Sequence, residues 1–200
     1  CGNASRCIGW LLMRDSGADV ARFETRGGAM LTATRAGEHV ISVDMGEPGL
    51  DWRQIPLAEE MDTAGILLSV DEDLYGPGCV SMGNPHVVFW VEEIEAAPVS
   101  EVGPIIERHW LFPEGVNVGF AEVRARDHIR LRVWERGAGL TQACGTGACA
   151  ALVASVRRDL VDRKARLELD GGDLTVEWRE ADNHVIMTGA IAVEFEGELP

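Results

Sequence analysis

The sequence has 200 residues, of which 46% are hydrophobic, so it can form one large or two small globular domains with a sizeable core. Its formal net charge of -15 argues against nucleic acid or an acidic membrane surface as a partner, because both bind clustered Lys and Arg. The sequence contains no apolar run of membrane-spanning length.

The five cysteines are an odd number, which argues against a secreted disulfide framework. We therefore expect reduced thiols in a cytoplasmic protein. The sequence opens at Cys1, without Met and inside a motif, so we also expect that a preceding segment is missing.

The first elements are predicted to be a helix followed by three strands. Residues 5–15 place Ile8, Trp10, Leu11 and Leu12 on one helical face, so the helix is predicted to be short and buried, with Gly17 ending it. Alternating stretches at 22–25, 29–34 and 39–44 predict strands, with a turn at 27–28.

The middle of the chain is predicted to change domain. Residues 46–76 have the composition of a connection with a short helix, 80–94 predict a strand entered through the Gly-Asn-Pro-His sequence at 83–86, and 100–110 predict a helix. Another strand begins at 117. Residues 128–135 alternate strictly, which places Glu135 on the core face, where a carboxylate needs a partner or a function.

The last part is predicted to be a helix and further strands. After Cys144, an apolar helical stripe is formed by Cys149, Leu152, Val153, Val156 and Leu160. Residues 165–195 alternate again and predict strands.

Three blocks of the sequence occur twice in the same order, which indicates a duplicated unit. Residues 1–3 correspond to 144–146, 21–28 to 165–172, and 39–41 to 184–186. Duplicated halves usually pack about a pseudo-two-fold axis. We therefore expect Cys1 and Cys144 to face one cleft.

Both of these cysteines lie in glycine-rich turns that open helices. Unpaired backbone N–H groups and the helix dipole are predicted to lower the pKa of such a thiol, which can then give or take protons. The turns could also bind an anion such as a carboxylate. Cys7, Cys79 and Cys149 lie in or beside apolar runs and are predicted to be buried and inert.

Several polar residues lie at predicted strand ends, and each taken alone is more often a turn former or a surface ion pair. They are Asn84, His86, Asn117, Glu135 and Arg136. Arg136 could clamp a carboxylate with two parallel hydrogen bonds. A zinc site is poorly supported, because neither cysteine pair has Cys-x-x-Cys spacing and no His pair accompanies them.

Five motifs together resemble the diaminopimelate epimerase family. They are CGNxxRC at 1–7, GNPH at 83–86, LFPEGVNV at 111–118, RVWERG at 132–137 and ACGTGA at 143–148. The motifs follow the family's order with compatible spacings over nearly the whole chain, so the resemblance is far more specific than a single cysteine turn.

The resemblance implies an α/β (α+β) fold of two pseudo-symmetric domains, each an antiparallel, barrel-like sheet around a central helix. The final strand would return to the first domain. We accordingly expect residues 1–45 with 190–200 to belong to an N-terminal domain, completed by the missing segment, and 46–189 to form a C-terminal domain.

The resemblance also implies an epimerase that interconverts LL- and meso-diaminopimelate without a cofactor or metal, on the way to lysine and peptidoglycan. The implied assembly is a homodimer. Carried over by motif, Cys1 and Cys144 are the catalytic pair, while His86 and Glu135 tune the thiols. The implied substrate-binding residues are Gly2, Asn3, Asn84, Asn117, Glu135, Arg136, Gly145 and Thr146.

Two departures from the family pattern concern the start of the chain. Ala4 replaces the glycine that is commonest after Cys-Gly-Asn, a mild change in a turn that must still enter a helix. The family also has a segment before Cys1 that supplies further substrate-binding asparagines and strands. Without that segment, the chain is expected to be inactive and poorly folded.

Three other functions remain as alternatives. A proline racemase or hydroxyproline epimerase would share the implied fold, but Asn84, Asn117 and the Glu135-Arg136 pair favour a substrate whose distal amino-acid end needs its own polar socket. A redox or metal-binding module could use the same thiols. A purely structural binding domain is least favoured, because it would not explain paired cysteine turns.

Overall fold

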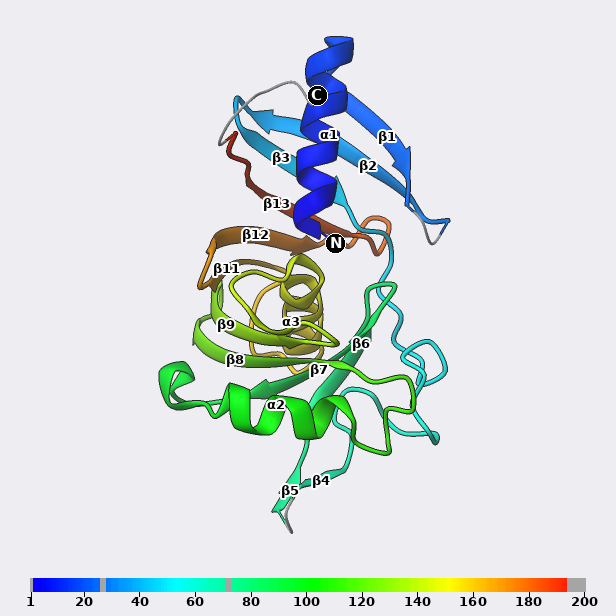
Figure 1. Cartoon of the computed structure of the whole chain (residues 1–200), viewed down its shortest axis with the longest axis vertical. Helices are drawn as coiled ribbons and strands as arrows, with labels where there is room; N and C mark the ends of the chain where they lie inside the picture. Colours follow the sequence, from blue (N-terminus) through cyan, green and yellow to red (C-terminus); the bar gives the residue numbers. More distant parts are fainter. Residues whose placement is uncertain (1, 26–27, 71–72, 194–200) are drawn as a thin grey trace, which may run out of the picture.

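A computed structural model of the chain describes residues 2–25, 28–70 and 73–193 (Figure 1). The first half contains α1 (Gly2–Ser16), β1 (Val20–Glu24), β2 (Met30–Gly37), β3 (Val40–Asp44), β4 (Leu68–Val70), β5 (Asp73–Tyr75), β6 (Gly78–Ser81) and β7 (Pro85–Trp90). The second half contains the 3-10 helix η1 (Ile94–Ala96), α2 (Val99–Glu107), β8 (Asn117–Ala125), β9 (His128–Glu135), β10 (Gly139–Thr141), α3 (Gly145–Arg157), β11 (Lys164–Leu169), β12 (Gly172–Trp178) and β13 (Val185–Ala190).

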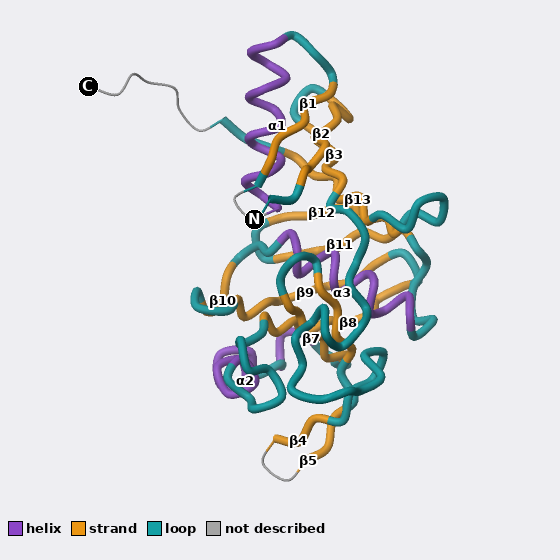
Figure 2. Tube along the Cα trace, turned by 90° about the vertical axis from the view of Figure 1, so that its right-hand side faces the viewer, coloured by secondary structure: helices purple, strands orange, loops and turns teal. Residues whose placement is uncertain are grey.

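One long sheet runs through the described part of the molecule in the order β1-β2-β3-β13-β12-β11-β9-β8-β7-β6, with β10 beside β9. Most neighbours are antiparallel, but β7 with β8 and β9 with β11 are parallel. The hairpin of β4 and β5 forms a separate two-stranded sheet at one end of the molecule (Figures 1 and 2). Both α1 and α3 therefore pack against one continuous, curved sheet.

The predicted duplication is visible in the order of the elements. α1 is followed by the antiparallel strands β1, β2 and β3, and α3 is followed by the antiparallel strands β11, β12 and β13. The equivalent strands β3 and β13 pair antiparallel, with Ser42 opposite Thr188 and their hydroxyl oxygens 2.7 Å apart. This pairing relates the halves as a two-fold axis would, and it joins them into one sheet.

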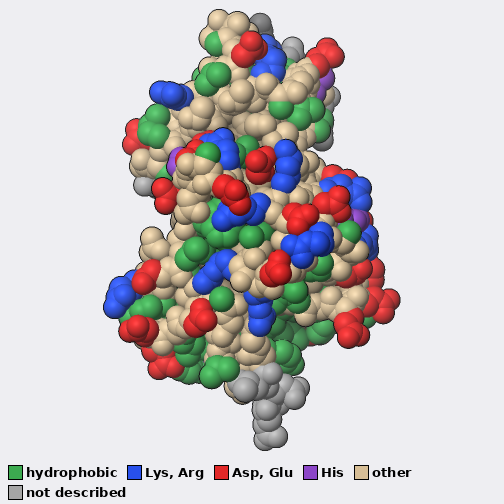
Figure 3. Space-filling model, turned by 180° about the vertical axis from the view of Figure 1, so that it is seen from behind, with side chains coloured by type: hydrophobic (Ala, Val, Ile, Leu, Met, Phe, Trp, Pro, Cys, Tyr) green, Lys and Arg blue, Asp and Glu red, His purple; other side chains and the backbone are tan. Residues whose placement is uncertain are grey.

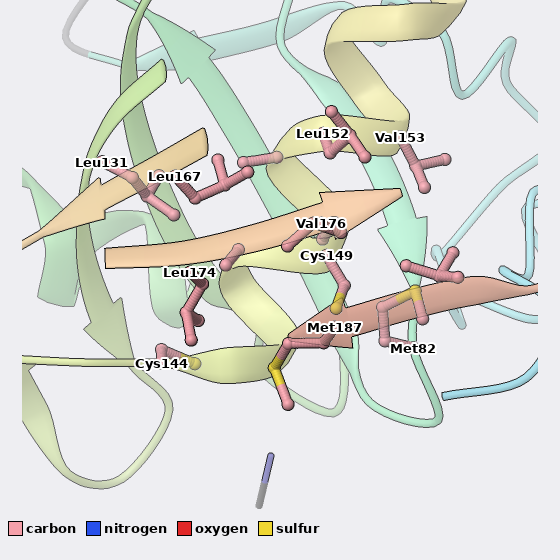
Figure 4. Close-up of a cluster of buried hydrophobic side chains, with 14 of the residues drawn as sticks. Met82, Leu131, Cys144, Cys149, Leu152, Val153, Leu167, Leu174, Val176 and Met187 are labelled. Carbon is pink, nitrogen blue, oxygen red and sulfur yellow. The ribbon is translucent and has the colours of Figure 1, made fainter. Parts of the chain in front are cut away.

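The sheet wraps around α3, which contacts strands from β6 to β13 (Figure 1). Its residues from Gly147 to Ser155 are all buried. Cys149, Leu152 and Val153 of the predicted stripe meet strand residues such as Leu167 and Val176 in the core (Figure 4). Leu160 instead lies beyond the end of the helix and is 37% exposed. α3 is thus the central helix of the larger, second half.

The prediction for the first helix was wrong in its extent and its buried face. α1 begins at Gly2 and buries Gly9 and Met13, whereas Ile8, Leu11 and Leu12 are 41–45% exposed. A Cβ built on Gly9 would lie 2.4 Å from the Cβ of Ala33, so the helix meets the sheet through its small residues. The close approach turns the larger apolar side chains away from the described strands. Cys7 was predicted to be buried and is exposed.

Two predictions for the middle of the chain were also wrong. Residues 46–70 contain turns and one bridge to the sheet, between Gly49 and Ser81, but no helix among the described residues. The stretch predicted as one strand at 80–94 is the hairpin of β6 and β7, turned at Gly83 with a φ of +83°. The Gly-Asn sequence makes a turn between strands, where it was predicted to begin one.

A second cluster of buried side chains lies between α2 and the outer face of β7 and β8. Phe89 and Phe120 stack within it, with ring centroids 5.6 Å apart. Gly103 lets α2 approach Trp134, because a Cβ there would lie 2.6 Å from the indole ring. Among the described residues, no helix is long and apolar enough to cross a membrane. The proposed domain limits near 45 and 190 stay a prediction.

Candidate active site

The first turns of α1 and α3 meet beside β13. A Cβ built on Gly2 would lie 3.1 Å from the Cα of Gly145, and one built on Gly145 would lie 3.0 Å from the Cα of Gly2. The Met187 side chain of β13 fills the remaining space, with its sulfur 2.9 Å from the position of a Gly145 Cβ. Only glycine fits at both positions, so these two residues bring the helix N-termini together. We call this place the helix junction.

Cys144 is the N-cap residue of α3 and lies at the helix junction. Figure 4 shows it at the start of α3, near Met187. Its sulfur accepts a hydrogen bond from the backbone N–H of Gly147 at 3.4 Å and lies 3.6 Å from the Thr146 hydroxyl. These contacts favour the thiolate. The side chain is only 4% exposed, however. Burial and the nearby Glu135 carboxylate together raise the pKa of Cys144 to about 11.

The prediction of a lowered pKa for this thiol was therefore wrong in sign. A helix N-terminus stabilises a thiolate, but desolvation of a buried sulfur outweighs the two hydrogen bonds, and Glu135 adds like-charge repulsion. At neutral pH, Cys144 is therefore a thiol. Cys1, its predicted partner, lies outside the described residues.

Glu135 ends β9 and points to the same side of the sheet as Val133, as the strict alternation predicted. Its Oε1 accepts a 2.6 Å hydrogen bond from the Thr141 hydroxyl across the hairpin of β9 and β10. The carboxylate is thereby held next to Cys144. The inward carboxylate of Glu135 therefore has a hydrogen-bond partner in Thr141, and it also affects the ionisation of the Cys144 thiol.

Asn84 connects a buried histidine to the start of α3. Its Nδ2 donates to the Thr146 hydroxyl at 3.4 Å, and its Oδ1 lies 3.2 Å from Nε2 of His86. His86 is 1% exposed, and burial, aided by the charge of Arg136, lowers its pKa to about 3. The imidazole is therefore neutral, with its Nε2–H donating to Asn84. His86 fixes the orientation of Asn84 and lies behind the site.

Asn117 and Arg136 form a second connected pair. The Asn117 amide donates to the Pro85 carbonyl at 2.8 Å and accepts the backbone N–H of Arg136 at 3.0 Å. The Arg136 guanidinium is exposed and donates to the carbonyls of Glu114 and Gly115. Among the described residues it has no carboxylate partner, so its charge is available to an anionic ligand.

Most of these side chains line one cavity of about 720 Å³. Five predicted residues lie on its wall: Asn84, Asn117, Glu135, Arg136 and Thr146. The rest of the lining comes from the first half and from the Met82 turn, with Ser5, Thr25, Ala29, Leu31, Met45, Gly46, Glu47, Met82 and Gly83. The duplicated halves thus enclose one space between them.

Three predicted residues lie at the helix junction and not on the cavity wall. Gly2 and Gly145 make the close approach, and Asn3 donates from Nδ2 to the Ala143 carbonyl at 3.4 Å. The Oδ1 of Asn3 is buried and has no partner among the described residues, so it can accept a hydrogen bond at the junction.

Comparison with known proteins assigns the chain to a family. The family model described as diaminopimelate epimerase matches residues 78–193. Diaminopimelate epimerase from Phenylobacterium zucineum is 66% identical over 203 residues, which cover all of this chain and 73% of that protein. The enzyme of that name from Caulobacter vibrioides is 60% identical over 209 residues, covering 71% of its length. The chain belongs to the diaminopimelate epimerase family.

Solved structures share the fold of this diaminopimelate epimerase family member. A hydroxyproline epimerase from Agrobacterium vitis superposes with a TM-score of 0.65 at 17% identity, over 93% of this chain and 63% of that one. A PhzF-type protein from Clostridium difficile gives 0.63 at 13% identity, over all of this chain and 73% of that one. These likenesses confirm the predicted α/β fold of paired, sheet-wrapped helices.

Sequence reasoning missed the cavity wall that the first half of this epimerase family member contributes. Gly46 has a φ of +80° and its N–H donates to Asp44, which turns the chain so that Met45 and Glu47 line the cavity. The Gly46-Glu47-Pro48 sequence indicates a turn, but it does not predict that this turn lines the same cavity as Arg136.

One trio of the described residues could hold a metal ion, and it lies outside the cavity. Asp44, Asp182 and His184 bring their ligand atoms within 4.8 Å of one another. Arg179 pairs with both aspartates, and Asp44 accepts from His184 at 2.8 Å. The ion pairs of these side chains account for the cluster.

Proposed function

We propose that this chain carries the activity of a diaminopimelate epimerase, interconverting LL- and meso-2,6-diaminopimelate through proton transfer at one α-carbon. The observation that carries the proposal is the helix junction beside the cavity. It presents Cys144 and two helix N-termini next to a cavity lined by Asn84, Asn117 and Arg136, whose guanidinium has no carboxylate partner among the described residues. A substrate with two amino-acid groups fits a site with donors at the helix junction and a second cationic group at Arg136.

The reacting end of the substrate would lie at the helix junction. Its carboxylate would accept from the backbone N–H groups of α1 and α3, which the helix dipoles reinforce. As the α-proton leaves, negative charge grows on this carboxylate, and preorganised donors in a site with little water stabilise it most at that moment. The Oδ1 of Asn3, which has no partner within residues 2–25, 28–70 and 73–193, is an acceptor suited to the adjacent ammonium group.

Inversion requires one base and one acid on opposite faces of the α-carbon. We propose that Cys1 and Cys144 are this pair, one as thiolate and the other as thiol. The raised pKa of Cys144 supports its entering the cycle as the thiol that donates a proton. After turnover the two thiols exchange roles, so the pair titrates as a coupled unit.

The distal end of the substrate would be recognised by Arg136 and the two asparagines. A guanidinium binds a carboxylate through two parallel hydrogen bonds. Because Asn117 holds the backbone of Arg136 and His86 holds Asn84, the socket is formed before the substrate arrives. We further propose a place in lysine and peptidoglycan precursor synthesis, a cytoplasmic location and a homodimeric assembly, as the family resemblance implies.

The deciding experiment is incubation of the purified protein with LL-diaminopimelate in deuterated water. We expect the meso product to carry deuterium at the inverted α-carbon, detected by mass spectrometry, because the donated proton comes from a thiol in exchange with solvent. Cys144→Ala should lose this activity, whereas Cys79→Ala, which removes a buried thiol outside the cavity, should keep it. Meso product without solvent label would rule out the two-thiol scheme, and turnover of proline or hydroxyproline alone would indicate another substrate.

A further inference from the structure

Arg6 of α1 is a buried cation without an anionic partner among the described residues. The residue is 8% exposed, its Nη1 lies 3.6 Å from the sulfur of Met187, and its Nε has no hydrogen-bond partner in the part of the chain that the structure describes. Burying an unpaired charge costs free energy, and proteins usually pair such a group or replace it by an apolar one. Its presence in the core needs a reason other than folding.

The guanidinium lies one side chain away from the helix junction. Met187 touches Arg6 on one side and occupies the space beside Gly2 and Gly145 on the other. A Cβ on Gly189 would lie 3.2 Å from Nε of Arg6, so glycine in β13 makes room for the guanidinium. Figure 4 shows Met187, Cys144 and Cys149 gathered where β13 passes the first turns of α3.

The duplication makes this position asymmetric. Counted from the two cysteine turns, Arg6 is the equivalent of Cys149, and the charge of Arg6 acts on Cys149 from α1. At equivalent positions, the first half therefore supplies the charged Arg6 and the second half supplies the neutral thiol of Cys149. Burial raises the pKa of this thiol to about 12. A cation at this pseudo-symmetric position can act on both helix N-termini.

We propose that Arg6 is a positioning residue for the proton transfer, its desolvated charge favouring the thiolate and the substrate carboxylate at the helix junction. The inference rests on the proposed function. A charge in a low-dielectric core acts over a longer distance than one in water, because little solvent screens it. Arg6 thus offsets, in part, the burial and the Glu135 carboxylate that oppose ionisation of Cys144.

Among the described residues, few groups could titrate around Arg6 and Cys144; the proposed partner Cys1 titrates with Cys144 and is present in every variant compared. Arg6 is packed against Cys149 of α3 and against β13, whose residues Val185–Ala190 include no titratable side chain; on α1 itself, Cys7 is adjacent. Cys144 is faced by Glu135 from β9, and Cys149 lies one turn further along its own helix. A change in the ionisation of Cys144 on removing Arg6 would therefore report the Arg6 charge.

The test is the pH dependence of Cys144 alkylation by iodoacetamide, read by peptide mass mapping so that exposed Cys7 is counted separately. In Arg6→Met and Arg6→Gln we expect the apparent pKa of Cys144 to rise, with alkylation at a fixed pH below that pKa slowed about threefold or more. Arg6→Lys, which keeps the charge, should stay within about twofold of wild type. kcat/KM for LL-diaminopimelate should fall more in Arg6→Met and Arg6→Gln than in Arg6→Lys.

A matched control is Arg157→Met, since Arg157 is a half-buried arginine at the opposite end of α3, roughly 20 Å along the helix axis from Cys144. It donates to Thr63 and to the Cys79 carbonyl, so its loss should lower the melting temperature and leave the alkylation profile unchanged. Arg6→Met should melt at or above the wild-type temperature.

An unchanged alkylation profile in a folded Arg6→Met or Arg6→Gln variant would overturn the proposal. So would failure of both neutral variants to fold, because Arg6 would then be a structural residue. The alkylation test does not depend on turnover. If wild-type protein does not act on LL-diaminopimelate while the profile still shifts, the proposed function fails and the role of the Arg6 charge stands.

Discussion

At the scale of single residues, the acidity of Cys144 is set by opposing contacts. The Gly147 N–H and the Thr146 hydroxyl stabilise the thiolate, whereas burial and Glu135 favour the thiol. A thiol that must take and return a proton benefits from this balance, because neither form is so stable that it traps the proton. Glu135 acts on Cys144 through its charge and through a hydrogen bond with the thiol, and its carboxylate is also held by the Thr141 hydroxyl.

Glu135→Gln is expected to lower the apparent pKa of Cys144. The substitution removes a negative charge that raises this pKa and leaves a side chain that can still accept from Thr141. Alkylation of Cys144 should therefore begin at lower pH than in wild type, again read by peptide mapping. kcat/KM should fall, because Glu135 also lines the cavity.

The control for this variant is Glu101→Gln, an exposed carboxylate in the first turn of α2 with no place in the cavity. It should match wild type in both measurements. If alkylation of Cys144 in Glu135→Gln needs higher pH than in wild type, Glu135 does not repel the thiolate and its assigned effect is wrong.

The inward direction of Glu135 could be predicted from the sequence, because strict alternation over β9 fixes the face of every side chain. The pKa of Cys144 could not. The glycine-rich turn signals a helix N-terminus, but the depth of burial depends on β12, β13 and the core packed against them, which lie far away in the sequence. The local sequence predicts the contacts that stabilise the Cys144 thiolate, but only the tertiary structure reveals the burial that opposes its ionisation.

At the scale of elements, the helix junction depends on two glycines that face each other. Gly145→Ala would place a methyl group 2.9 Å from the Met187 sulfur and 3.0 Å from the Cα of Gly2, and a backbone atom cannot move aside as a flexible side chain can. We expect the variant to lose about 1 to 3 kcal/mol of unfolding free energy, as overpacked sites do. Epimerisation should fall by more than tenfold, because the two helix N-termini are pushed apart.

Gly76→Ala is the matched substitution, since a Cβ at Gly76 meets nothing within 4 Å. Urea denaturation should place it within about 0.5 kcal/mol of wild type. Wild-type activity in Gly145→Ala would show that the approach of α1 and α3 does not matter to catalysis.

Within the two repeats, the order of the elements followed from the sequence, because the duplication repeats one helix and three strands and each copy supports the prediction of the other. The buried face of α1 did not. An apolar stripe normally marks the core side of a helix, but here Gly9 meets Ala33 so closely that the stripe of Ile8 and Leu11 turns outward. The short distance between α1 and the sheet, and not the hydrophobic periodicity of the helix, therefore decides which face of α1 is buried.

At the scale of the whole molecule, charge is dispersed over much of the surface. On the face seen in Figure 3, Lys and Arg side chains stand among Asp and Glu. Ion pairs such as Arg126 with Asp162 and Arg166 with Asp173 account for much of the basic charge on the second half. Exposed pairs of this kind contribute little stability, so the pH dependence of folding should be governed by the few groups whose pKa the fold shifts.

Two histidines with opposite shifts define that dependence near neutral pH. His184 donates a hydrogen bond from Nδ1 to the Asp44 carboxylate, which raises the pKa of His184 above its ordinary value. The stability from this pairing is fully present below about pH 6.5 and is lost as the pH rises through the folded-state pKa. His86 has the opposite sign, because burial lowers its pKa to about 3.

Unfolding of the molecule should therefore become easier as the pH falls from about 6.5 toward 5, and His86 should be the main cause. In the folded state His86 stays neutral, whereas in the unfolded chain it takes up a proton below its ordinary pKa, so acid favours unfolding. One proton limits the slope to about 1.4 kcal/mol per pH unit. Carboxylates with lowered pKa, such as Glu168, affect stability only below this pH range.

His86→Gln keeps a donor for Asn84 and removes the titrating imidazole. Its unfolding free energy, measured by urea titration at pH 5.0 and 6.5, should therefore change less than that of wild type. His184→Gln is the control: it should retain the full acid slope and lose only the decline above neutral pH. Equal slopes for wild type and His86→Gln would mean that the buried imidazole is not what limits stability in acid.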